Sequence, residues 1–133
     1  HFTAYATAKA GLVRFSETLA EELKPHKVRV NCIAPGAMQT DLLAEVLESQ
    51  AGEKEINIAK TVFDGAGSCM DGIADLALFL ASDKSKNITG KLISALWDDW
   101  EAWPEHIDQL NASDVYTLRR ITGRDRGHSW GDK

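Results

Sequence analysis

A long amphipathic helix followed at once by a short strand and a Pro-Gly turn is the feature that most limits how this chain can fold. Apolar residues recur every three or four positions near its start, which is the period of one helix face. They are Ala8, Leu12, Phe15, Leu19 and Leu23. The pattern predicts a helix from Ala4 to Leu23, with Thr3 as its N-cap and Pro25 just beyond its end.

The run from Val28 to Ile33 is rich in β-branched side chains and precedes Pro35-Gly36, which indicates a strand and then a turn. A helix that leads into a short strand is typical of an α/β protein with a parallel sheet. Ligands of such sheets bind beyond the carboxyl ends of the strands. We therefore expect the segment from Ala34 to Thr40 to face a ligand; an ordinary Pro-Gly turn is the alternative.

Tyr5 and Lys9 are four positions apart, so a helix places them on one face, one turn from each other. A nearby ammonium stabilises a phenolate, so we expect Lys9 to lower the pKa of Tyr5. The partial positive charge at a helix amino terminus acts in the same direction. Such a tyrosine can serve as a general acid or base. From the spacing alone, a packed ring beside a solvated amine is the alternative.

Four segments in order resemble the classical short-chain dehydrogenase/reductase family. Tyr5-Ala6-Thr7-Ala8-Lys9 is similar to the family's Tyr-x-x-x-Lys motif, and Val28 to Gly36 to its strand and Pro-Gly turn. Phe79 to Asp83 and Ile88 to Gly90 are similar to its last helix and last strand. The resemblance covers about the first 96 residues.

The resemblance implies an α/β fold, the carboxyl-terminal portion of a Rossmann-like doubly wound parallel sheet. Residues 1–96 would form this part, and residues 97–133 a carboxyl-terminal extension. The family's Gly-rich nucleotide-binding turn and catalytic serine would lie upstream of His1. We therefore expect the chain to be the carboxyl-terminal part of a larger enzyme and inactive alone.

The same resemblance implies an oxidoreductase that interconverts an alcohol and a carbonyl with NAD or NADP. Tyr5 would be the general acid or base, assisted by Lys9. The implied cofactor-binding residues are Tyr5, Lys9, Pro35, Gly36, Ala37, Met38 and Thr40. The partner would be a small-molecule alcohol or carbonyl. A homo-oligomer, a dimer or tetramer paired through the tyrosine-bearing helix, is also implied.

Two other functions stay open. Sugar-nucleotide epimerases and dehydratases also use Tyr-x-x-x-Lys, although Phe79 to Asp83 and Ile88 to Gly90 favour the dehydrogenase. The chain is alternatively a non-catalytic fragment, or a binding or scaffold member of the same fold, because fold does not determine function.

The remaining segments carry weaker patterns. We expect helices at residues 41–50, 71–82, 104–110 and 113–121, and a last strand at 88–96. Asp71 would cap the second of these helices. Residues 51–70 show no dominant period, and the resemblance implies that they form a substrate-binding loop. Trp97, Trp100 and Trp103, three apart, could share one side of a helical turn; we favour packing of the tail over a substrate wall or lid.

Composition excludes several classes of function. The net charge is −5, which gives no reason to expect nucleic acid or an anionic membrane as a partner. No apolar run approaches the length of a membrane span. Two cysteines, Cys32 and Cys69, do not make a disulfide framework, and we expect a cytoplasmic protein. The histidines do not have the spacing of metal ligands. Arg119, Arg120, Arg124 and Arg126 are expected in a solvated, frayed terminus.

Overall fold

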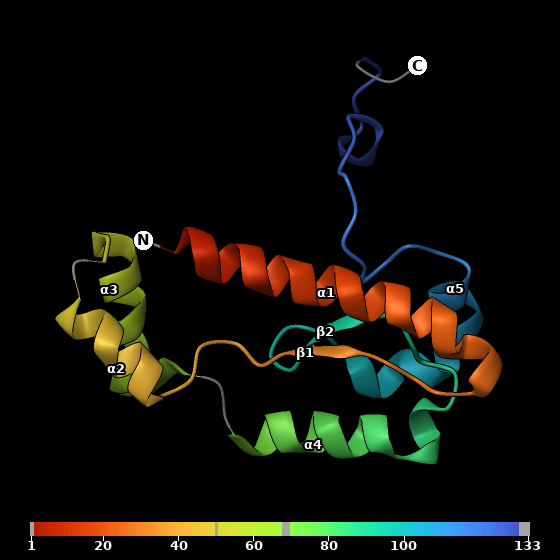
Figure 1. Ribbon diagram of the computed structural model, residues 1–133, viewed down its shortest axis with the longest axis horizontal. Coiled ribbons are helices and arrows are strands. Elements are labelled where there is room, and N and C mark those ends of the chain that lie inside the picture. Colours follow the sequence, from red (N-terminus) through yellow and green to blue (C-terminus); the bar gives the residue numbers. More distant parts are fainter. Residues whose placement is uncertain (1, 50, 68–69, 131–133) are drawn as a thin grey trace.

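The computed structural model describes residues 2–49, 51–67 and 70–130. Two short parallel strands, β1 (Cys32–Ala34) and β2 (Leu92–Ser94), pair with Cys32 opposite Leu92. Helix α1 (Thr3–Leu23) lies on one side of them and α4 (Met70–Ala81) on the other (Figure 1). Helices on both faces of a parallel sheet confirm the predicted fold class, part of a Rossmann-like α/β fold.

Helix α1 was predicted nearly to its ends. It begins at Thr3, so Thr3 lies in the first turn and is not the N-cap; Phe2 holds that position without a side-chain hydrogen bond. In its carboxyl half, the small side chains of Ser16 and Ala20 are buried. Gly90 approaches Ala20 with a φ of +72°, a left-handed conformation that glycine adopts without strain. Small residues therefore allow the helix and the chain before β2 to lie close together.

Both strands are shorter than the predicted ranges of 28–33 and 88–96, because side chains replace part of the backbone pairing. The Val30 amide donates to Thr89 Oγ1 at 3.0 Å. The Lys91 amide donates to Asn31 Oδ1 at 3.1 Å. The two segments run alongside each other before the regular pairing begins at Cys32. Hydroxyl and amide groups at these positions form bonds that a strand pattern does not predict.

The segment after β1 is mostly helical. Helix α2 (Asp41–Glu48) is two residues shorter than predicted and is capped by Thr40, whose Oγ1 accepts a hydrogen bond from the Leu43 amide at 3.2 Å. Helix α3 (Glu53–Thr61) continues into a π-helical turn at Val62–Ala66, within the range that showed no period. Gln50 and residues 68–69, which include Cys69, lie outside the described residues.

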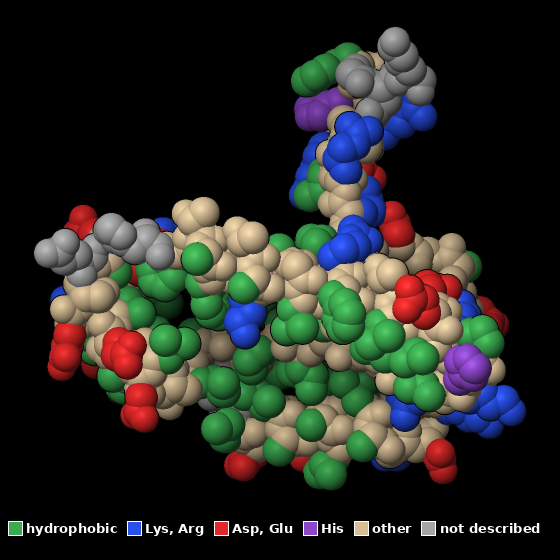
Figure 2. All heavy atoms as spheres, in the orientation of Figure 1, with side chains coloured by type: hydrophobic (Ala, Val, Ile, Leu, Met, Phe, Trp, Pro, Cys, Tyr) green, Lys and Arg blue, Asp and Glu red, His purple; other side chains and the backbone are tan. Residues whose placement is uncertain are grey.

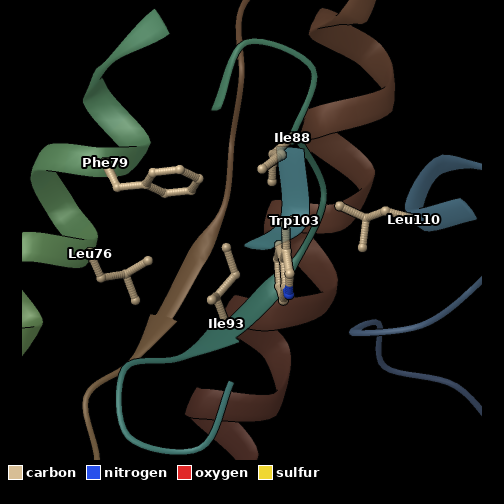
Figure 3. Packing of buried hydrophobic residues seen from close by; sticks show 6 residues of the cluster. All are labelled: Leu76, Phe79, Ile88, Ile93, Trp103 and Leu110. Carbon is tan, nitrogen blue, oxygen red and sulfur yellow. The ribbon is translucent and has the colours of Figure 1, made fainter. Parts of the chain in front are cut away.

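The hydrophobic core lies between α4, the strands and the carboxyl-terminal segment. Figure 3 shows Leu76 and Phe79 of α4 directed toward Ile93 of β2. Ile88, Trp103 and Leu110 complete the buried cluster. Helix α4 begins at Met70, so Asp71 lies inside its first turn and does not cap it. The segment expected as an extension therefore contributes two large side chains to the core.

The three tryptophans do not share one side of a helical turn. Trp103 is buried in the core, and the Trp100 ring packs on Phe79 with a centroid distance of 5.1 Å. Trp97 is 80% exposed. Packing of the tail is thus confirmed for Trp100 and Trp103. Their backbone is a 3-10 helix at Trp100–His106 that contains Pro104, followed by α5 (Ile107–Asn111), in place of one helix at 104–110.

The helix predicted at 113–121 is wrong, because the carbonyl groups of this region bond to β2 and the residue before it. The Lys91 ammonium donates to the Leu110 and Val115 carbonyls, both at 3.0 Å. The Leu92 amide donates to the Tyr116 carbonyl at 2.8 Å, and Tyr116 has a φ of +59°. These long-range bonds hold the segment in an irregular path beside β2.

Beyond this point the chain projects away from the body, and basic side chains lie along it (Figure 2). The prediction of a frayed terminus is wrong at Arg119. Its guanidinium makes two hydrogen bonds of 2.8 Å to Asp125 and an ion pair of 2.7 Å with Asp114. These bonds hold the pKa of the Asp125 carboxyl well below its usual range, and the amide and hydroxyl of Thr122 add to the effect.

Candidate active site

The predicted catalytic pair lies on the first two turns of α1. Tyr5 is 52% exposed, and its ring packs edge to face on the Phe2 ring, with 6.4 Å between the ring centroids. The Lys9 Nζ lies 5.5 Å from the centroid of the Tyr5 ring. An ammonium at this distance from an aromatic face is attracted to it and adds positive charge beside the phenol. The structure therefore brings Tyr5 and Lys9 together and leaves the tyrosine accessible to a ligand.

The second group of predicted site residues follows the carboxyl end of β1. Gly36 has a φ of +80°, so the turn after Pro35 requires a conformation that residues with a side chain rarely adopt. Gly36 and Ala37 are exposed, and Met38 is half-buried. Thr40 accepts the Leu43 amide as the cap of α2, which leaves its hydroxyl proton available to a ligand.

Gln39 holds this turn in place, and no sequence pattern predicted that role. Its Nε2 donates to the Val62 carbonyl at 3.0 Å, which ties the turn to the end of α3. A Cβ built at Gly67 would lie 3.3 Å from the Ala37 carbonyl oxygen, so the π-helical turn and the Pro-Gly turn are in close contact. A glutamine in a loop has no distinctive spacing, and only the fold reveals its partner.

The two groups lie toward the same end of the molecule. Figure 1 shows the amino end of α1 at the end that also holds α2 and α3. Among the hydrogen bonds of the described residues, none joins Tyr5 or Lys9 to residues 35–40. The structure thus places the pair and the turn toward one end of the molecule, with no hydrogen bond between them among the described residues.

These residues offer groups that could contact the nicotinamide end of a dinucleotide. Gly36 leaves backbone uncovered where a flat ring could approach, and the Thr40 hydroxyl and the Lys9 ammonium offer hydrogen-bond donors. In the described ranges, no cluster of three or more His, Cys, Asp or Glu side chains could hold a metal ion. In the same ranges, no helix has the length and apolar character needed to cross a membrane.

Comparison with known proteins shows where the chain belongs. The family model described as Enoyl-(Acyl carrier protein) reductase matches residues 1–95. An uncharacterized short-chain type dehydrogenase/reductase of Sinorhizobium fredii is 38% identical over 90 residues, which cover 67% of this chain and 34% of that protein. The chain belongs to the short-chain dehydrogenase/reductase family.

Other members of this oxidoreductase family are similar to it over the same region. The 3-oxoacyl-(acyl-carrier-protein) reductase FabG of Chlamydia trachomatis is 42% identical over 92 residues, 69% of this chain and 36% of that protein. The protein of the same name from Aquifex aeolicus is 37% identical over 91 residues, 67% of this chain and 34% of that protein. This short-chain dehydrogenase/reductase chain thus spans about a third of the length of these curated relatives.

Proposed function

We propose that the protein carrying this chain interconverts an alcohol and a carbonyl with NAD or NADP, with Tyr5 as general acid or base. The observation that carries the proposal is the accessible Tyr5 ring with the Lys9 Nζ 5.5 Å from its centroid. Membership of an oxidoreductase family supports it, because the pair occupies the region that the family model matches.

The chemistry follows from the groups present. In reduction, the Tyr5 hydroxyl donates its proton to the carbonyl oxygen, and the Lys9 charge stabilises the phenolate that remains. In oxidation, the phenolate accepts the proton of the alcohol. The bound nicotinamide would supply or accept the hydride. The word "reductase" occurs in the family description and in the names of the relatives. It supports reduction of a carbonyl as the direction of the reaction.

We assign the cofactor contacts of this proposal to Tyr5, Lys9 and the turn formed by residues 35–38 with Thr40. The left-handed Gly36 and the unused Thr40 proton support contacts of this turn with a flat ring and a polar amide. In this proposal, Lys9 donates a hydrogen bond to a ribose hydroxyl.

The proposal includes a small-molecule carbonyl or alcohol as substrate and a homo-oligomer as the working state. Leu12 is 52% and Phe15 is 62% exposed on α1, an apolar pair that supports pairing of two copies through this helix. A dimer or tetramer would bury them. We propose the cytoplasm as the compartment, where a free thiol such as that of Cys32 stays reduced.

The test is Tyr5→Phe in the complete protein, with NADH or NADPH oxidation by carbonyl compounds as the readout. The substitution keeps the ring and removes the proton, so kcat/KM should fall by about 10² to 10⁴-fold. The matched control is Tyr116→Phe, because the Tyr116 ring packs on Trp103 at 4.3 Å and has no part in the proposed chemistry. Full activity of Tyr5→Phe would refute the assignment and favour a non-catalytic binding or scaffold role.

A further inference from the structure

Trp97 is an exposed aromatic side chain on a fixed backbone. Its ring is 80% exposed, whereas its amide donates to Ser94 Oγ at 3.1 Å. The Leu96 amide donates to the same oxygen at 3.3 Å, and Asp98 Oδ2 accepts the Ser94 amide at 2.7 Å. The turn is also tied to β1, since the Ala95 amide donates to the Ala34 carbonyl at 3.1 Å. The chain therefore holds an apolar ring in solvent in a defined place.

Trp97 lines a groove of about 700 Å³ between this turn and α3. The other apolar side chains of the groove come from Ile58, Val62, Leu96 and Ala37. Glu53 and Lys54 also line the groove and contribute one charge of each sign, which favours an uncharged occupant. Asn57 and Thr61 supply the neutral polar groups.

The groove is continuous with the turn assigned to the cofactor, because Ala37 lines it. Ala37 follows the carboxyl end of β1, and Trp97 follows that of the adjacent parallel strand β2. Small molecules bind beyond the carboxyl ends of parallel strands. A substrate that presents its carbonyl to the cofactor would therefore have its remaining part beside Trp97.

Resting on the function proposed above, we propose that Trp97 is a specificity-determining residue and that the groove receives a flat, uncharged apolar part of the substrate. The Trp97 indole stacks on this part, and Ile58 and Leu96 pack on its edges. Stacking on a ring whose backbone is already fixed costs little conformational entropy, so binding favours flat groups over small aliphatic ones.

The experiment compares kcat/KM for acetophenone and acetone in the complete protein. In Trp97→Ala the ratio of acetophenone to acetone should fall about tenfold, which is the factor expected for one lost aromatic contact. Trp97→Phe should keep most of the preference. The matched control is Trp130→Ala, because Trp130 is 71% exposed in the projecting tail and stacks on His128.

The outcomes separate the two proposals. An unchanged ratio in Trp97→Ala, with both ketones still reduced, overturns the specificity role and leaves the oxidoreductase proposal intact. If neither ketone is reduced, saturation-transfer NMR with 1-phenylethanol decides. Binding that Trp97→Ala abolishes and Trp130→Ala retains supports the groove, and binding that is absent or unaffected overturns it. Loss of self-association in Trp97→Ala with an unchanged ratio identifies a second copy as the occupant and also overturns the proposal.

Discussion

Arg29 and Ser85, 56 positions apart, are joined by two hydrogen bonds: the Arg29 Nη1 donates to the Ser85 Oγ at 2.7 Å and to its carbonyl oxygen at 3.0 Å. Ser85 is fully buried, and its hydroxyl lies 2.9 Å from the Phe79 carbonyl. This pair connects the chain before β1 to the 3-10 turn at Asp83–Ser85 that follows α4.

Ser85→Ala should therefore destabilise the protein. The change leaves the buried Phe79 carbonyl and one Arg29 donor with fewer partners, so we expect a loss of about 1–3 kcal/mol in the free energy of unfolding. Urea unfolding measures it. The control is Ser49→Ala, an exposed serine that bonds a carbonyl of its own helix. Equal effects of the two changes would show that the Arg29 contact adds nothing.

Trp103 and Trp97 should respond very differently to truncation. Trp103→Ala removes a ring that packs on Leu110, Ile93 and their neighbours, so we expect a loss of about 3–5 kcal/mol. Trp97→Ala removes an exposed ring and should stay within about 0.5 kcal/mol. Thermal and urea unfolding compare the two variants. A large loss in Trp97→Ala would indicate that its ring is buried in the working protein.

Lys9→Met should lower activity without unfolding α1. The change removes the charge that lies 5.5 Å from the Tyr5 ring centroid, so kcat/KM should fall by about 10² or more. Methionine is a good helix former, so circular dichroism should be unchanged. Lys24→Met is the control, since Lys24 directly follows α1 and forms an ion pair of 3.6 Å with the exposed Glu21. Similar losses in both variants would argue against a local role of Lys9.

Lys91 should give stability an alkaline pH dependence. Burial lowers the pKa of its ammonium, and Asp114 and Glu17 only partly offset this. Between the lowered value and the ordinary 10.5, the unfolded chain binds more protons than the folded chain. The contribution of Lys91 to the free energy of unfolding should therefore rise with pH in this window. The difference between wild type and Lys91→Met, measured by urea unfolding, should show the rise; a flat difference would contradict it.

Asp125 should remain ionised in acid well below its ordinary pKa. Its carboxylate is held by Arg119 first and then by the Thr122 amide and hydroxyl. At neutral pH these bonds hold the tail in an ordered conformation. They are lost only as the pH falls through the lowered pKa of Asp125. Carbon NMR of the Asp125 carboxyl follows the titration. In Arg119→Gln the transition should move to higher pH, and an unmoved transition would exclude Arg119 as its main cause.

Much of the frame could be predicted from local patterns. The apolar period and Pro25 identified α1 almost to the residue, and the period around Leu76 and Phe79 identified α4. The spacing of Tyr5 and Lys9 indicated one helix face, which the structure shows. These features depend on neighbours close in the sequence, so the sequence alone carries them.

The errors arose where distant residues decide the structure. The helix predicted at 113–121 is replaced because Lys91 and Leu92 bond to its carbonyls across the fold. Strand lengths depended on Asn31 and Thr89, whose side chains take backbone partners. The different burial of Trp97 and Trp103 could likewise not be predicted, because the spacing of the tryptophans does not show which ring packs in the core.

The bonds beside β2 also determine where the sheet can be extended. The outward-facing amides of Leu92 and Ser94 are both occupied from within the chain, by the Tyr116 carbonyl and by Asp98. A strand from another molecule would find no free donors at these positions, so this edge is a poor template for intermolecular aggregation. Any further strand, from this protein or from a partner, would have to add along β1, and the growth of the sheet is therefore directed to one side.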